Sequence, residues 1–260
     1  MFFELLRAFI KNNADLKNLI GNNEIIIQMN IHGVKPYHLI ITRDTCKYDI
    51  GTFNNPSFKF NSNLVNLGKL ILGELDPSIG LFSGIFQVQG DFNAIINFLE
   101  LLDFIGEKLG ILKRGERRTF IQLEDMKKLL DIYLNGSEYA DPSILPLFLE
   151  ILTAFTNLNP KAQNFIRDEN QIFLIELKDD SSYVIQLKNG KMRWYEGTSE
   201  FFTFKAITTL KDSIDIVITG NPISPYLKGN LIIEGDISYA LFYQELIHLF
   251  LDHLGLIEKI

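Results

Sequence analysis

The chain has 260 residues, 47% of them hydrophobic and 22% charged, and a formal net charge of −7. This length predicts one or two domains with well-packed cores, and the composition excludes a disordered or collagen-like chain. The negative charge argues against a general nucleic-acid binder, because such proteins contact phosphates with a surplus of cations. The single cysteine, Cys46, excludes an intramolecular disulfide and fits a reducing compartment.

The first ten residues are apolar but carry Glu4 and Arg7. Their apolar positions, among them Phe2, Leu6 and Ile10, have the spacing of an amphipathic helix rather than the uninterrupted stretch of a secretory signal. No window approaches the roughly 18 consecutive apolar residues of a membrane span. We therefore expect a soluble, cytoplasmic protein.

An internal repeat dominates the rest of the chain. The run Gly84–Asp91 reappears as Gly229–Asp236, an offset of 145 residues, and Gly51-Thr52 reappears as Gly197-Thr198 at an offset of 146. Repeats at a fixed spacing indicate duplicated structural units. We expect two homologous domains, 1–112 and 140–260, joined by a basic and helical connector at 113–139.

Both copies show the same order of predicted elements. An amphipathic helix, at 2–10 or 144–155, precedes strand-like runs, and Asn189-Gly190 predicts a hairpin. The predicted strands are 24–31, 37–42, 58–60 and 70–72 in the first copy, and 171–177, 183–187, 204–207 and 214–218 in the second. A further alternating strand is predicted after Gly84, with Phe86 and Val88 on one face, and after Gly229, with Leu231 and Ile233 inward.

A long helix closes each copy. Gly84 and Gly229 are expected in the left-handed conformation, and Asp91 and Asp236 are placed to cap the apolar helix that follows. The order predicts an α+β fold, in which each domain is a mainly antiparallel sheet with helices gathered on one face.

The run Asp76–Asp91 with its following helix, and the second run Asn221–Asp236, resemble the sterol carrier protein 2 (SCP2) lipid-binding domain. The resemblance covers nearly the whole chain apart from the connector. It implies a tandem of two such domains, each a five-stranded sheet covered by helices around an apolar cavity. It also implies binding of sterols, fatty acids, acyl-CoA esters or phospholipids.

Large apolar side chains on the last strand and the long helix of each copy are the candidate ligand contacts. In the first copy they are Phe82, Phe86, Val88, Ile95, Phe98, Leu99 and Leu102. In the second they are Leu227, Leu231, Ile233, Tyr239, Tyr243, Leu246 and Phe250. The same residues would serve equally well to fill a core, and the sequence does not separate the two roles.

No motif for catalysis, metal binding or a cofactor stands out. His248 and His253 are five residues apart and face different sides of a helix, and Cys46 is a lone thiol. We therefore expect no catalytic residue, no metal, no cofactor and no enzymatic activity.

A basic cluster in the connector comprises Lys113, Arg114, Arg117 and Arg118. It suits either transient contact with anionic lipid headgroups or a merely solvated connector. No nucleic-acid partner is expected, and the sequence identifies no protein partner.

The leading hypothesis is a non-enzymatic carrier of a hydrophobic, lipid-like ligand. One alternative is a structural or protein-interaction module whose cavities are filled by side chains. It is motivated by differences between the copies, where Gly80 corresponds to Pro225 and Ile95 to Ala240. Another is an accessory protein to a lipid-modifying enzyme.

Overall fold

The computed structural model describes residues 2–21, 24–108, 110, 121, 123–136, 141–178, 181–219 and 221–256. The chain folds as two compact units, Met1–Leu123 and Glu124–Ile260. The basic cluster at 113–118 lies outside the described residues.

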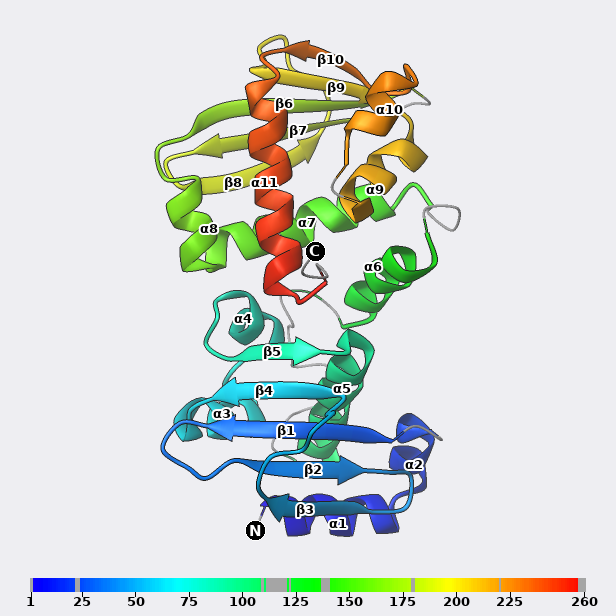
Figure 1. Ribbon diagram of the computed structural model, residues 1–260, viewed down its shortest axis with the longest axis vertical. Coiled ribbons are helices and arrows are strands. Elements are labelled where there is room, and N and C mark those ends of the chain that lie inside the picture. Colours follow the sequence, from blue (N-terminus) through cyan, green and yellow to red (C-terminus); the bar gives the residue numbers. More distant parts are fainter. Residues whose placement is uncertain are drawn as a thin grey trace. The chain divides into compact units, whose positions relative to one another are not determined.

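The first unit is a five-stranded sheet in the order β3-β2-β1-β4-β5, with its helices shown in Figure 1. Its elements are α1 (Phe2–Asn12), α2 (Ala14–Ile20), β1 (Ile25–Ile31), β2 (Tyr37–Ile41), β3 (Cys46–Ile50), β4 (Phe58–Ser62), α3 (Leu64–Ile71), α4 (Pro77–Phe82), β5 (Gln87–Gly90) and α5 (Phe92–Lys108).

The second unit repeats this order as β8-β7-β6-β9-β10. Its elements are α6 (Leu123–Asn135), α7 (Ile144–Leu158), α8 (Pro160–Phe165), β6 (Asn170–Leu177), β7 (Ser182–Lys188), β8 (Lys191–Glu196), β9 (Phe204–Thr208), α9 (Leu210–Thr219), α10 (Ile223–Leu227), β10 (Ile232–Gly235) and α11 (Ser238–His253).

Both sheets are mixed, which corrects the expectation of mainly antiparallel sheets. β1 pairs with β4, and β6 with β9, in parallel. The first three strands of each sheet form a hairpin meander, and the chain then crosses back to add the fourth strand beside the first. Hairpin signals reveal antiparallel neighbours, but nothing in a single sequence marks such a return.

Two predicted strands are helices. Residues 70 and 71 end α3, with Leu72 as its C-cap, and residues 214–218 lie inside α9. Short apolar runs fit a buried strand and one face of a helix equally well. In both cases the helical alternative is correct.

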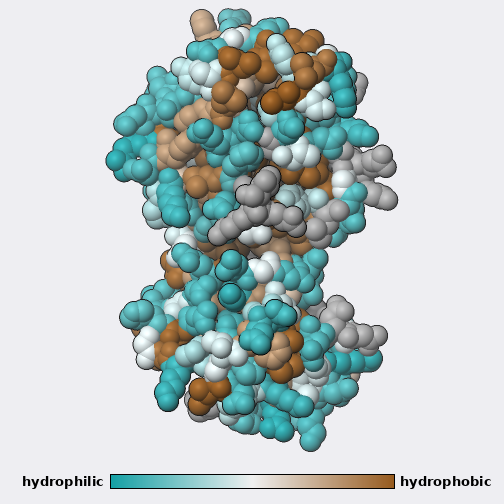
Figure 2. Space-filling model, viewed as in Figure 1, coloured by the Kyte–Doolittle hydropathy of each residue, from teal (hydrophilic) through white to brown (hydrophobic). Residues whose placement is uncertain are grey.

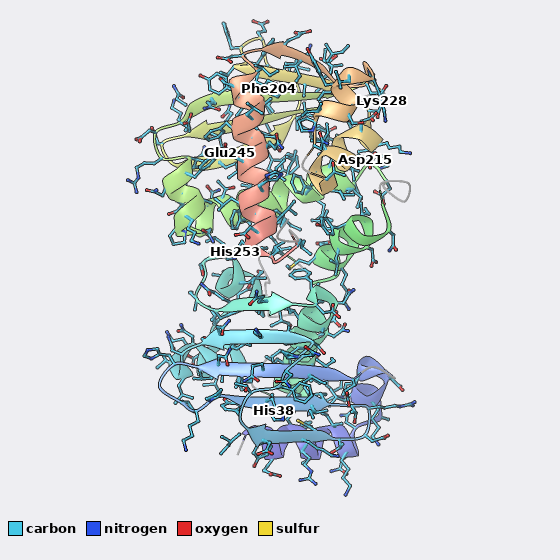
Figure 3. All side chains as sticks on the ribbon, in the orientation of Figure 1. His38, Phe204, Asp215, Lys228, Glu245 and His253 are labelled. Atoms are coloured by element: carbon cyan, nitrogen blue, oxygen red, sulfur yellow. The ribbon has the colours of Figure 1, made fainter. Side chains whose placement is uncertain are left out.

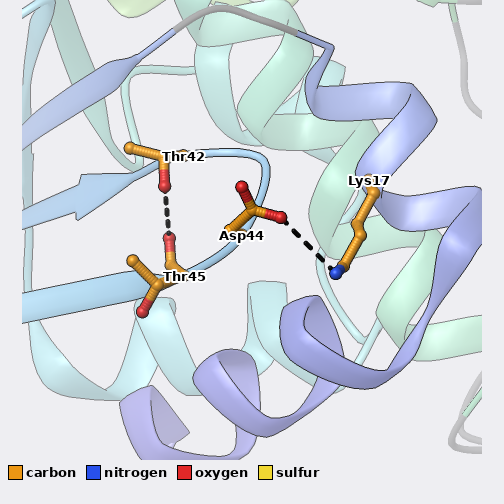
Figure 4. A network of polar contacts seen from close by, with 4 residues as sticks. All are labelled: Lys17, Thr42, Asp44 and Thr45. Atoms are coloured by element: carbon orange, nitrogen blue, oxygen red, sulfur yellow. Dashed lines mark hydrogen bonds and ion pairs between the residues drawn. The ribbon is translucent and has the colours of Figure 1, made fainter.

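The β2–β3 turn shows how the second hairpin of the first unit closes (Figure 4). Thr42 Oγ1 donates to the Thr45 carbonyl oxygen at 3.3 Å, and Lys17 Nζ on α2 lies 3.5 Å from Asp44 Oδ1. In the β7–β8 hairpin of the second unit, Asn189 and Gly190 have φ of 52° and 67°, as predicted for an Asn-Gly turn.

The glycine of the repeated Gly-Asp pair has the same structural role in both units, whereas the N-cap of α11 is Ile237 and not Asp236 as predicted. A Cβ on Gly90 would lie 2.5 Å from the Ser57 carbonyl oxygen, and one on Gly235 would lie 2.5 Å from the Thr203 carbonyl oxygen. These close approaches, together with positive φ values, require glycine. The next residue in the first unit, Asp91, accepts hydrogen bonds from backbone nitrogens of the first turn of α5, as predicted for a cap.

Helix α7 is fastened to the edge strand β8. The side chain of Asn157 pairs with both the amide nitrogen and the carbonyl oxygen of Met192, each at 2.9 Å. Trp194 Nε1 donates to Glu150 Oε2 at 3.0 Å. The two Asn157 contacts occupy backbone groups of Met192 on β8, which is an edge strand of the sheet.

Helix α6, in the predicted connector, packs within the second unit. Ile132 belongs to a small apolar cluster with Ile144 and Ile214, beside the half-buried Leu129. Tyr133 on α6 also donates a hydrogen bond to the Leu256 carbonyl oxygen. No described helix is both long and apolar enough to cross a membrane.

Candidate functional site

The second unit contains an apolar cavity between its sheet and the helices α7, α9 and α11. Its interior holds about 80 Å³, and the void including the mouth, which opens to solvent, measures about 770 Å³. Figure 1 shows α11 crossing the sheet, and Figure 3 places Phe204, one of the lining residues, on β9. The lining consists of Leu145, Phe173, Ile175, Phe204, Ala206, Thr208, Ser213, Ile216, Val217, Pro222, Leu231, Ile233, Ala240, Tyr243, Gln244 and Ile247.

Matching strand registers show which residues of the two units correspond. In the first sheet Phe60 lies between Met29 and Val88, and in the second Ala206 lies between Ile175 and Ile233. These positions differ by 146 residues in the first four strands and by 145 in the last, as the sequence repeat does.

In the first unit, aromatic side chains pack together at positions that correspond to the cavity lining. The rings of Phe60 and Phe86 stack with centroids 5.2 Å apart. Phe86 also lies against Gly80 of α4, where a Cβ would come within 2.4 Å of Phe86 Cε1.

The second unit has smaller residues at three of these positions. Ala206 corresponds to Phe60, Leu231 to Phe86, and Ala240 to Ile95 of the first unit. All three line the cavity. Smaller side chains on β9, before β10 and on α11 therefore leave room for the cavity, while the strand register is the same as in the first unit.

Polar groups are few in the cavity wall. The Tyr243 hydroxyl and Thr208 Oγ1 are buried and have no hydrogen-bond partner among the described residues. Burial raises the pKa of the Tyr243 phenol, which therefore stays neutral. Ser213 Oγ donates to the Leu210 carbonyl oxygen at 2.7 Å. Among the described residues that line the cavity, none carries a charge.

Exposed apolar side chains lie on α10, next to the cavity lining. Pro225 is the buried residue of this short helix, whereas Ile223, Tyr226 and Leu227 are exposed. Figure 2 shows brown side chains gathered over α10, β10 and the start of α11. Pro222 and Leu231, on either side of α10 in the chain, line the cavity, so both ends of this helix lie next to the lining.

The structure separates the seven candidates of the second copy. Leu231, Ile233 and Tyr243 line the cavity. Leu246 and Phe250 are buried elsewhere, Tyr239 is half-buried on α11 outside the lining, and Leu227 is 77% exposed.

The helical repeat explains this division. The cavity face of α11 is formed by Ala240, Tyr243, Gln244 and Ile247, which lie three or four residues apart. Phe250 continues this face by one turn but packs against Phe148 and Phe155 of α7.

The seven candidates of the first copy are all buried, with exposed fractions of 7% or less. Phe98 packs against Phe58 with ring centroids 5.7 Å apart, and Phe86 stacks on Phe60. These contacts place both residues in the aromatic core of the first unit. Their role as ligand contacts stays a prediction.

Sequence reasoning missed the lining residues of α9, Ile216 and Val217, because that segment was expected to be a strand. It also missed Ala206, because only large apolar residues were taken as candidates. The signal that finds Ala206 is its replacement of Phe60 in the aligned repeat.

Cys46 and His253, which were considered as reactive or metal-binding residues, are packed among other side chains away from the cavity. Cys46 begins β3 and is 1% exposed, and burial raises the pKa of its thiol to about 12. His253, near the end of α11 (Figure 3), lies beside the Phe155 ring with centroids 5.2 Å apart. Neither lines the cavity.

Comparison with known proteins gives a family match for part of the second unit. Residues 152–248 match the SCP-2 sterol transfer family, a segment that runs from within α7 into α11 and includes the whole second sheet. The first unit lies outside the matched segment. No curated protein matches the chain.

Several solved structures are similar to parts of the chain. One is the sterol carrier protein domain 2 of Helicoverpa armigera, with 19% identity, a TM-score of 0.37, and coverage of 46% of this chain and 98% of that one. A ubiquinone synthesis protein, UbiJ-SCP2, has 17% identity, a TM-score of 0.35 and coverage of 40% and 86%. Sterol carrier protein 2 from Yarrowia lipolytica has 12% identity, a TM-score of 0.31 and coverage of 39% and 87%.

Proposed function

We propose that the second unit binds and carries a hydrophobic, lipid-like ligand in the cavity between its sheet and α11. The observation that carries this proposal is that the family-matched segment holds an apolar cavity where the first unit has packed aromatic rings. Compared with the first unit, the second unit has smaller side chains at aligned positions and the same strand register. A fold adapted to bind a ligand between its sheet and helices requires this combination.

Burial of apolar surface would drive binding. Removing apolar area from water stabilises a complex by about 25 cal/mol per Å² before the costs of association. The interior of about 80 Å³ is smaller than the roughly 300–1,000 Å³ of typical ligand sites. A lipid would therefore widen the interior, and we expect the short helix α10, whose chain neighbours Pro222 and Leu231 line the cavity, to move.

We propose a carrier rather than an enzyme, acting in the cytoplasm. Among the described residues of the wall, the side chains are apolar apart from three hydroxyls and one amide, and none offers a charged acid or base. The buried, protonated thiol of Cys46 lies in the other unit. The SCP-2 sterol transfer family match of the second unit supports carriage.

For the first unit we propose a supporting or protein-binding role. Its packed rings of Phe60 and Phe86 favour the alternative of a module filled by its own side chains. The same sheet would then serve two purposes in one chain, a carrier in the second unit and a scaffold in the first.

The proposal is tested by filling the cavity with the first unit's own residue. Ala206→Phe places on β9 the side chain that Phe60 has on β4, and we expect it to abolish lipid binding while the second unit stays folded. Ile207→Phe introduces the same ring on the opposite face of β9 and serves as the matched control.

Native mass spectrometry of the freshly purified protein, followed by solvent extraction, identifies any bound lipid. Calorimetric titration with fatty alcohols, fatty acids, sterols and phospholipids then measures affinity. The wild type and Ile207→Phe should bind and Ala206→Phe should not. Failure of the wild type to bind any of these lipids, or equal binding by Ala206→Phe, would overturn the proposal.

A further inference from the structure

The cavity wall contains a polar group that the packing of the protein does not use. The Tyr243 hydroxyl is buried, has no hydrogen-bond partner among the described residues, and belongs to a side chain that lines the cavity. Its ring packs against Phe173 of β6 with centroids 5.5 Å apart. A buried donor without a partner is costly, so such a group in a native fold requires an explanation.

Alignment of the two units shows that the first unit has no counterpart of this hydroxyl. The residue that corresponds to Tyr243 is Phe98, which packs against Phe58 in the filled first unit. The next position changes in the same direction, from Leu99 to Gln244, and Gln244 also lines the cavity. Polar atoms therefore occur on this helix face in the unit with the cavity, where the filled unit has apolar ones.

The Thr208 hydroxyl is a weaker indicator. It also lines the cavity without a partner among the described residues, but Ser62, its counterpart in the first unit, is equally unpaired. An unpaired hydroxyl at this position therefore accompanies a filled core as well. The inference rests on Tyr243.

We infer that the cavity takes lipids whose uncharged polar group, a hydroxyl or a carbonyl, enters the interior and hydrogen-bonds to Tyr243. This inference rests on the proposed carrier function. A neutral phenol can donate to a carbonyl oxygen or exchange hydrogen bonds with an alcohol.

An ionised headgroup does not suit the interior. The described wall residues carry no positive charge that would compensate a buried carboxylate or phosphate. A lipid that enters by its apolar end leaves the Tyr243 hydroxyl unpaired. A neutral lipid that enters by its polar end satisfies this hydroxyl and buries its own polar group at the same time.

The test compares ligands that differ in the headgroup alone. Calorimetric titration uses the full chain with a fatty alcohol, its methyl ether and the ionised fatty acid, all of the same chain length. We expect the alcohol to bind about tenfold more tightly than the fatty acid. Tyr243→Phe, which removes only the hydroxyl, should abolish most of this preference.

Tyr239→Phe is the matched control, because Tyr239 lies on the same helix outside the cavity lining. It should leave the preference unchanged. If the wild type binds alcohol and fatty acid equally, or if Tyr243→Phe retains the preference, the inference is wrong although the carrier function stands. If none of the three ligands binds to wild type, and the wider lipid panel also fails, the proposed function itself is wrong.

Discussion

Cys46 shows how burial determines the behaviour of a single residue. Its thiol lies at the start of β3, and burial raises its pKa from 9.0 to about 12, while Arg7 lowers it and Glu4 raises it by smaller amounts. In the unfolded chain the thiol ionises near its ordinary pKa. The folded protein therefore holds a proton that the unfolded chain releases between about pH 9 and pH 12.

This difference predicts an alkaline loss of stability. The contribution of the thiol is fully present below about pH 9, and above it the unfolding free energy falls by at most about 1.4 kcal/mol per pH unit. Urea denaturation between about pH 8 and pH 10 should show a steeper fall for the wild type than for Cys46→Ala, which lacks the titrating group. Parallel pH profiles for the two proteins would contradict this assignment.

For single residues, part of the cavity lining could be predicted from the sequence. Leu231, Ile233 and Tyr243 were predicted and line the cavity, whereas Tyr239 and Leu227 were predicted and do not. Apolar character is common to all of these residues. For the residues on α10 and α11, the deciding factor is the direction in which each side chain points around the helix axis, which one sequence does not specify.

Helix α4 and its counterpart α10 differ at a residue that determines how closely the next segment of the chain packs against the helix. Gly80 lets Phe86 approach the backbone of α4, whereas α10 has Pro225 at the corresponding position. The absence of a side chain at Gly80 is thus what allows the aromatic ring to fill the first unit.

We therefore predict opposite effects for two glycine substitutions in helices. Gly80→Ala places a Cβ 2.4 Å from Phe86 Cε1 and should destabilise the protein by about 1–3 kcal/mol through overpacking. Gly68→Ala in α3 meets no atom within 4 Å and should stabilise it by up to about 1 kcal/mol through helix propensity. Chemical denaturation followed by circular dichroism measures both, and a stabilising Gly80→Ala would refute the close packing of α4 on Phe86.

Elements with strong local signals were predictable and the others were not. Asp91 as a cap and Asn189-Gly190 as a turn are confirmed because each depends on neighbouring backbone alone. The parallel pairing of β1 with β4 depends on a chain return, and α9 was mistaken for a strand because its apolar run is short. Tertiary context decides both.

The whole molecule combines two sheets of the same order and register with different interiors. Each sheet belongs to its own compact unit. If the second unit alone has room for a guest, a ligand will stabilise one half of the chain and leave the other unaffected.

Differential scanning calorimetry tests this division. We predict two unfolding transitions, of which a bound lipid at about 100 times its Kd stabilises only one, by about 2.7 kcal/mol. Gly80→Ala should lower the other transition, which identifies it as the first unit. A single transition, or a ligand shift in both, would contradict the proposed division.

The tryptophan in the contact between α7 and β8 gives the protein a fluorescence signal of its own. Trp194, which donates its indole N–H to Glu150 and lies near Tyr183, is the single tryptophan among 260 residues and belongs to the second unit. Indole fluorescence excited at the red edge of aromatic absorption therefore originates from this unit alone. The emission of unlabelled protein reports on the unit with the cavity, while the first unit, with its many phenylalanines, remains dark.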